Sequence, residues 1–227
     1  SQMTWLQRPT AQGVEVASRN FAEAMMQDQL NTAILALVTA ISAQSTAKND
    51  VSSGSPVHTV TYDGINGAHA KFGDASGSLV AQVMSGAMFH RLISQNLANA
   101  ERLFTSTNVN VVDILGKAVI VTDAPALTSY TSPNYYDKVL SLAEGAATVF
   151  DGGDVVSNVE TTNGKLRIET TLQIDYTFGL GLKGYTWDEQ NGGKSPTNSD
   201  LSTASNWDKV ASDIKNTAGV ITIGKTV

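Results

Sequence analysis

Cysteine and histidine, which often carry out catalysis or bind metals, are absent or few in this chain, and the histidines lie far apart in its sequence. There is no cysteine, so thiolate nucleophiles, disulfides and cysteine-bound metals are excluded. The three histidines are His58, His69 and His90, and none has the His-x-x-x-His or carboxylate spacing of a metal site. The sequence therefore predicts no metal ligand.

Three glycine-containing segments superficially match motifs that bind or cleave small molecules. Residues 179–184 read Gly-Leu-Gly-Leu-Lys-Gly, which is the spacing of a dinucleotide-binding loop, but the Tyr-Thr-Trp-Asp that follows is not a helix start. In residues 73–77, Gly-Asp-Ala-Ser-Gly, the serine comes one place too late for a nucleophile elbow. Residues 151–154, Asp-Gly-Gly-Asp, lack the alternating acids and downstream glutamate of a calcium loop. We interpret all three as turns or close strand contacts, and we expect no catalytic residue and no cofactor.

Charge and hydrophobicity exclude two further classes of partner. The chain has 227 residues, with 15 Lys and Arg against 21 Asp and Glu, so its net charge is −6. Nucleic-acid binders normally carry a basic stripe, and no window has one, so we expect no sequence-specific nucleic-acid binding. Apolar runs such as 33–41 fall far short of the roughly 18 residues that span a bilayer, so we expect no membrane contact. No basic and apolar leader opens the chain, which favours assembly in a bacterial cytoplasm.

Two long segments would form the framework of the fold. Residues 14–42 have the periodicity of one unbroken amphipathic helix, and residues 165–178 alternate as a long strand with one wet face. The apolar stripe of the helix comprises Met26, Leu30, Ala33, Ile34, Leu37, Val38 and Ile41. We expect this stripe to pack on a sheet that includes the 165–178 strand.

Shorter elements fill the rest of the chain. We predict helices over 65–72, over 87–104 with Ser85 as its cap, and within 196–205; strands over 79–84, 139–150 and 220–223; and a hairpin or bulge at Gly116. Residues 124–137 are predicted to be a loop. This segment contains Tyr130, Tyr135 and Tyr136, and tyrosine favours interfaces because it combines apolar area with a polar tip. The three are candidate subunit-interface residues, although a surface loop with incidental tyrosines is an equal alternative.

Three blocks of sequence, in this order and spacing, resemble the major capsid proteins of tailed bacteriophages and prophages. They are KFGDASGSLVAQVMSGAMFHRLI (71–93), NVVDILGKAVIVTDAPAL (110–127) and SPTNSDLSTASNWDKV (195–210). The resemblance covers nearly the whole chain. It implies an α+β protein with the Hong Kong 97-type capsid fold, built from a long spine helix, a peripheral domain sheet and an axial domain.

The resemblance also implies an interleaved domain organisation. Residues 1–60 would belong to the peripheral domain, 61–157 to the axial domain, 158–190 again to the peripheral domain, and 191–227 would return to the axial domain. The chain reaches its long helix after about ten residues, so we interpret it as lacking the N-terminal arm and extended loop that precede this helix in the family.

The function implied is that of a structural shell subunit and not of an enzyme. Its partners would be copies of itself, arranged as pentamers and hexamers of an icosahedral head, together with scaffolding, portal or decoration proteins. Its location would be the virion. Two alternatives remain: the shell of an encapsulin-type nanocompartment, which shares the fold, and an enzyme whose polar residues meet only in the folded chain.

Overall fold

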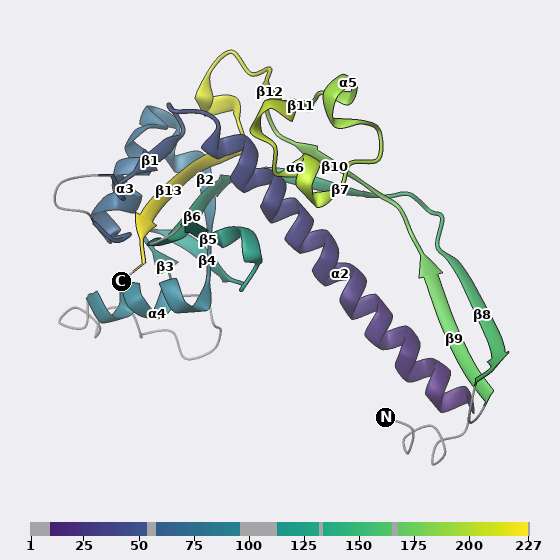
Figure 1. The fold of residues 1–227 in the computed structure, drawn as a ribbon. Coiled ribbons are helices and arrows are strands. Elements are labelled where there is room, and N and C mark those ends of the chain that lie inside the picture. The colour runs from purple at the N-terminus through teal and green to yellow at the C-terminus, as the bar shows by residue number, and fades with distance from the viewer. Residues whose placement is uncertain (1–9, 54–57, 96–112, 132–133, 165–167, 227) are drawn as a thin grey trace.

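One long helix, α2 (Thr10–Ser42), runs from the end of an arm into the body of the protein (Figure 1). The computed structural model describes residues 10–53, 58–95, 113–131, 134–164 and 168–226. The helix has 33 residues, which at 1.5 Å per residue makes it about 50 Å long. No proline occurs within it, so no helical N–H is missing. The prediction of one unbroken helix over 14–42 is confirmed.

The body is built on a seven-stranded sheet. Its strands are β1 (Lys48–Asp50), β2 (Leu79–Met84), β3 (Asp113–Ile114), β4 (Lys117–Val121), β5 (Thr128–Thr131), β6 (Asn134–Ala143) and β13 (Gly219–Lys225). They lie in the order β1-β13-β6-β2-β4-β3, and β5 pairs with β6 outside this path. β1 is parallel to β13 and β2 to β4, whereas the other pairs are antiparallel. The strands predicted over 79–84 and 220–223 are confirmed.

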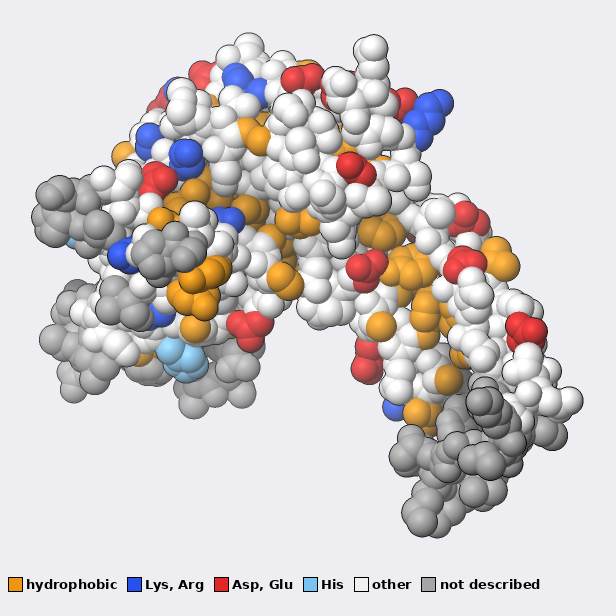
Figure 2. Space-filling view, viewed as in Figure 1, with side chains coloured by type: hydrophobic (Ala, Val, Ile, Leu, Met, Phe, Trp, Pro, Cys, Tyr) orange, Lys and Arg blue, Asp and Glu red, His pale blue; other side chains and the backbone are white. Residues whose placement is uncertain are grey.

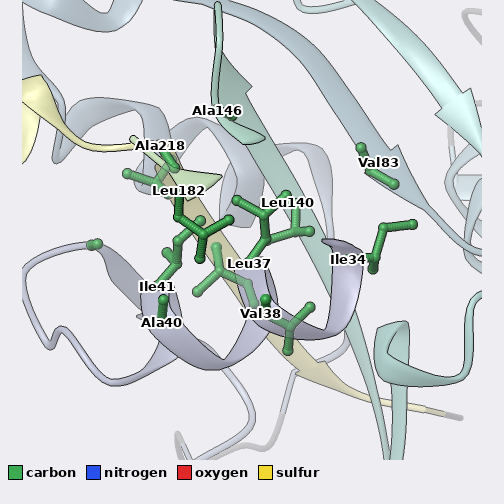
Figure 3. Close-up of a cluster of buried hydrophobic side chains, with 14 of the residues drawn as sticks. Ile34, Leu37, Val38, Ala40, Ile41, Val83, Leu140, Ala146, Leu182 and Ala218 are labelled. Carbon is green, nitrogen blue, oxygen red and sulfur yellow. The ribbon is translucent and has the colours of Figure 1, made fainter. Parts of the chain in front are cut away.

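Helices cover both faces of this sheet. The C-terminal half of α2 covers one face, where Leu37 and Ile41 point toward Leu140 of β6 (Figure 3). The other face packs with α3 (Tyr62–Ala70) and α4 (Gly86–Gln95). This second cluster comprises Val60, Ile65, Met84, Met88, Leu92, Val119 and Val139. Successive residues of β2 face opposite sides, Val83 toward α2 and Met84 toward α4, as the pleat of a strand requires.

Side-chain caps determine where the two short helices begin. The Met88 N–H donates to Ser85 Oγ at 3.2 Å, which confirms the predicted cap; residues 96–104 of this predicted helix lie outside the described residues. The helix predicted over 65–72 begins three residues earlier, at Tyr62. The reason is that Thr61 Oγ1 accepts from the Gly64 N–H at 3.1 Å and satisfies one of the free donors of the first turn.

The arm consists of the N-terminal half of α2 and a hairpin beside it, β8 (Val156–Asn163) and β9 (Ile168–Asp175) (Figure 1). The antiparallel strands β7 (Ala147–Asp151) and β10 (Phe178–Leu182) join this hairpin to the body. Tyr176 holds hairpin and helix together. Its hydroxyl donates to Asp28 Oδ2 at 2.5 Å, and its ring meets Phe21 edge to face. The hydrogen bond to the Asp28 carboxylate raises the pKa of Tyr176 to about 12.

The packing predicted for the long helix is right for only one half of its apolar stripe. Leu37 is 3% exposed, whereas Met26 and Leu30 are 59% and 42% exposed. The strand predicted beneath the helix is also placed differently, because within the described residues β9 pairs with β8 and not with the seven-stranded sheet. The helix extends past the edge of that sheet (Figure 1), so the sheet does not cover Met26 and Leu30 on the outer part of the stripe.

Two segments between the long elements differ from their predictions. Residues 124–137 are not a loop but the turn η3 (Pro125–Leu127) followed by the β5–β6 hairpin. The single strand predicted over 139–150 is two strands, because the chain turns at Gly145, whose φ of +68° only glycine adopts readily. Of the hairpin or bulge predicted at Gly116, the hairpin is confirmed between β3 and β4, where Gly116 has a φ of +75°.

The C-terminal region adds a small layer against the body end of α2. It comprises β11 (Tyr185–Trp187), α5 (Glu189–Gly192), α6 (Asn198–Leu201), η4 (Ala204–Asn206), β12 (Trp207–Lys209) and η5 (Ile214–Asn216). The short helix predicted within 196–205 is confirmed as α6, which Thr197 and Asp200 cap reciprocally. Residues 179–184 are strand and turn, and β11 follows them in place of the helix that a dinucleotide site needs.

The half-buried stripe of α2 predicts different costs for the same substitution at two positions. Leu37→Ala should lower the free energy of unfolding by about 2–5 kcal/mol, because it leaves a cavity between helix and sheet. Leu30→Ala should lower it by about 1 kcal/mol or less, because Leu30 is already half in water. Urea unfolding followed by circular dichroism measures both, and equal losses would contradict the packing described.

His69 predicts a pH dependence of stability. It is buried on α3, with Nε2 3.0 Å from Ser141 Oγ; burial, and then the charge of Lys117, lower its pKa. As the pH drops, the imidazole of His69 therefore binds a proton in the unfolded chain before it does so in the folded protein. The free energy of unfolding should then fall as the pH drops from about 6.5 through the lower pKa of the folded protein. In urea titrations from pH 7.5 to 5, His69→Gln should flatten this dependence, and an unchanged slope would refute the assignment.

Candidate assembly surfaces

Two of the three predicted interface tyrosines form one exposed aromatic pair. Tyr130 of β5 lies directly opposite Tyr135 of β6. Their ring centroids are 4.4 Å apart, and each residue is 58% exposed. Opposite residues of an antiparallel pair share a face of the sheet, so the two rings present one apolar surface with two hydroxyl groups to solvent. We call this the tyrosine pair.

Tyr136 is not part of this surface. It is adjacent to Tyr135 in β6 and therefore points to the other face. It is half-buried and lies between Ser129 of β5 and Lys225 of β13. The structure thus brings together two of the predicted residues and places the third within the sheet.

A buried carboxylate fixes the base of the hairpin that carries the tyrosine pair. Asp137 follows in β6, and its side chain is 4% exposed. Its Oδ2 forms an ion pair with Arg91 of α4 and accepts from Thr226 Oγ1 at 3.0 Å. The Thr226 N–H also donates to the Tyr135 carbonyl at 2.8 Å. The start of β6, which carries Tyr135, is therefore tied both to α4 and to the residue after β13.

A second surface, which the sequence did not reveal, is an apolar groove of about 450 Å³ where the arm leaves the body. Its lining comprises Gln29, Leu30, Ala33, Ile34 and Leu37 of α2, Val80, Ala81 and Val83 of β2, Ile120 of β4, and Leu142–Ala147 and Val149. We call it the α2 groove. The space-filling view shows apolar side chains gathered at the angle between body and arm (Figure 2). The sequence shows the length of the apolar stripe on α2, but it does not show where the sheet beneath that stripe ends.

The residues considered for chemistry do not form a reaction centre. In the part of the chain that the structure describes, no three or more His, Asp or Glu side chains group as a metal site would require. His69 bonds to Ser141 instead. Asp151 and Asp154 act in a turn, where Asp151 Oδ1 accepts from the Gly153 N–H at 3.0 Å and Asp154 Oδ1 bonds to Thr177. None of the described helices is long and apolar enough to cross a membrane.

The buried ion pair predicts a strong effect of a small substitution. Asp137→Asn should lower the free energy of unfolding by about 2 kcal/mol, because it leaves the partly buried Arg91 guanidinium without its counter-charge. The matched control is Asp74→Asn, which breaks an exposed ion pair with Lys215 and should leave the unfolding midpoint unchanged. Thermal denaturation compares the two, and equal shifts would contradict the role given to Asp137.

Comparison with known proteins places the chain in a family. The model of the Gp13-like family, described as "Major capsid protein 13-like", matches residues 1–221. No curated protein matches the chain. The family match spans all three sequence blocks and both surfaces described above, and it confirms the resemblance to bacteriophage major capsid proteins. The chain therefore belongs to the Gp13-like family of major capsid proteins and is a structural protein of the phage virion.

Proposed function

We propose that this capsid protein is the repeating subunit of an icosahedral phage head with the Hong Kong 97-type fold, and that its copies are arranged as pentamers and hexamers. Family membership supports the role in a shell. The arrangement of a long helix, an elongated hairpin beside it and a separate mixed sheet agrees with the fold that the resemblance implies (Figure 1). Shell formation requires no bond chemistry; it requires complementary surfaces that symmetry repeats.

The two-part shape supports the proposed domain organisation. The arm takes its segments from 1–60 and 158–190, which are the two ranges assigned to the peripheral domain, together with the last residues before 158. Most of the seven-stranded sheet, with α3 and α4, falls within 61–157 and 191–227, the ranges assigned to the axial domain. Three segments depart from these ranges: β1 and the C-terminal half of α2 lie in the first range, and β11 lies in the third, but all three belong to the body.

The exposed tyrosine pair is the feature of the structure that best supports a specific contact between subunits. Exposed aromatic side chains are among the residues that contribute most to binding between proteins. Here the two rings already contact each other and stand on a hairpin fixed by Asp137 and Thr226. Little conformational freedom remains to be lost when they bind, so more of the interaction energy is available for association. We assign the tyrosine pair to a contact between copies of the chain.

Association of the purified chain tests this assignment. Replacing both Tyr130 and Tyr135 by Ser should raise the concentration for half-association by more than about tenfold, as the loss of a central aromatic anchor does. Light scattering and sedimentation velocity measure association, and electron microscopy identifies any closed particles. Val210→Ser serves as control, because Val210 is equally exposed but lies away from the tyrosine pair.

The outcomes separate the two parts of the proposal. A wild-type chain that stays monomeric at every concentration would count against a self-assembling subunit. A wild-type chain that associates, with a serine variant that associates equally well, would remove only the tyrosine pair from the contact.

A further inference from the structure

We propose that the tyrosine pair of one copy docks into the α2 groove of a second copy, so that the two surfaces form one head-to-tail contact. This inference rests on the proposed self-assembly of the chain and goes further by naming both sides of a contact. Three properties of the described residues support this contact: the apolar character of the groove, the chemistry of the tyrosine side chains, and the position of the two surfaces on the sheet.

The α2 groove is an apolar surface that this chain does not cover with its described residues. Four side chains on it, Leu30, Val80, Ile120 and Val149, are each between 41% and 48% exposed. One turn further out on the same stripe of α2, Met26 is 59% exposed. Exposed apolar residues that occur singly are common in soluble proteins, whereas these four line one groove together. A shell protein must bury surface against its own copies. We therefore take a second copy of the chain as the partner that fills this groove.

The tyrosine pair matches this groove in chemistry. Aromatic rings bury a large apolar area, while each phenol keeps an O–H that needs an acceptor once it leaves water. The groove supplies apolar walls from Ile34, Leu37 and Val83, and Gln29 and Glu144 are among the residues around it. An amide oxygen and a carboxylate both accept hydrogen bonds. The groove has a volume of about 450 Å³.

The two surfaces lie on opposite faces of the seven-stranded sheet. Leu142 of β6 lines the groove, on the face that α2 covers. Tyr135 is seven positions earlier in the same strand, and an odd separation places it on the other face. Val139 is four positions after Tyr135, so the two residues share a face of β6. Val139 packs on the side of α3 and α4, which agrees with placing Tyr135 on that face. The tyrosine pair therefore cannot occupy the groove of its own chain.

Contact between two different surfaces of identical chains has a structural consequence. Such a heterologous contact repeats from copy to copy and closes into a ring when the rotation between copies permits it. A contact between like surfaces would produce a two-fold dimer and stop there. The arrangement of groove and tyrosine pair is thus suited to the rings of five and six that a capsid requires.

Cross-linking tests the contact directly, because the chain has no cysteine of its own. One chain carries Val80→Cys in the groove. A second, of different mass, carries Thr128→Cys, which is exposed on β5 and shares the face of Tyr130. After the two chains are mixed and allowed to associate, a short bifunctional thiol reagent should link them into heterodimers. Two other partners for the groove chain serve as comparisons: Val159→Cys on the exposed β8–β9 hairpin, and Val210→Cys as background.

Each cross-linking result decides the question. A yield with Thr128→Cys well above both comparisons supports the contact. A higher yield with Val159→Cys would assign the groove to the hairpin of the second copy and overturn the proposal. Yields no greater than that of Val210→Cys would likewise overturn it.

A double-mutant cycle provides the second test. Leu30→Glu places a charge in the groove without loss of helix propensity, and it should weaken association by more than about tenfold, because a charge desolvated without a partner is costly. Val210→Glu should leave association unchanged. If the groove and the tyrosine pair form one contact, Leu30→Glu added to the Tyr130→Ser, Tyr135→Ser chain should weaken association little further.

The controls distinguish failure of this inference from failure of the proposed function. Circular dichroism and the thermal midpoint confirm that each variant is folded. Fully additive effects, or normal association of folded Leu30→Glu, would overturn the docking while self-assembly stands. Absence of association by the wild-type chain at all concentrations would overturn self-assembly and the docking together.

Discussion

The burial of one half of α2 against the seven-stranded sheet is the constraint on which the rest of the structure depends. Leu37 and Ile41 lie in the core with Leu140, so the helix is fixed in the body by its C-terminal turns. A rigid helix of about 50 Å that is held at one end must project at the other. The arm is therefore a consequence of core packing in the body, and the apolar stripe that continues past the sheet follows from the same geometry.

Polar interactions orient the parts that hydrophobic burial leaves undetermined. Tyr176 attaches the β8–β9 hairpin to the helix through Asp28 and Phe21. At the other end of the molecule, Asp137 joins β6 to α4 and to the last strand. Hydrogen bonds and ion pairs of this kind have strict geometry, so they set positions where apolar contact alone would allow several. In a shell subunit this precision matters, because a small error in one contact is repeated by symmetry in every copy.

In the described residues, no three or more His, Asp or Glu side chains group as a metal site would require, and the function that the family gives this protein is structural. Polar residues that superficially matched a ligand-binding motif stabilise turns instead. Asp151, for example, accepts a hydrogen bond from the Gly153 N–H. What remains unexplained by folding alone is exposed apolar surface, on the tyrosine pair and in the α2 groove. Exposed apolar surface lowers the solubility of a monomer. In a capsid protein, the same surface can be buried against other copies when the shell assembles.

The sequence by itself determined the family, the long helix, the buried strand over 79–84 and the capped start of α4, because these depend on local periodicity and on residues close in the chain. It did not determine that 124–137 is a hairpin, since β5 is an edge strand of Thr, Ser and Tyr whose pattern is not alternately apolar. Nor did it separate Tyr136 from Tyr130 and Tyr135, because side chains alternate between two faces only in a strand and this segment was predicted to be a loop. The groove was decided by tertiary structure alone: only the width of the sheet beneath α2 sets where the apolar stripe stops being covered.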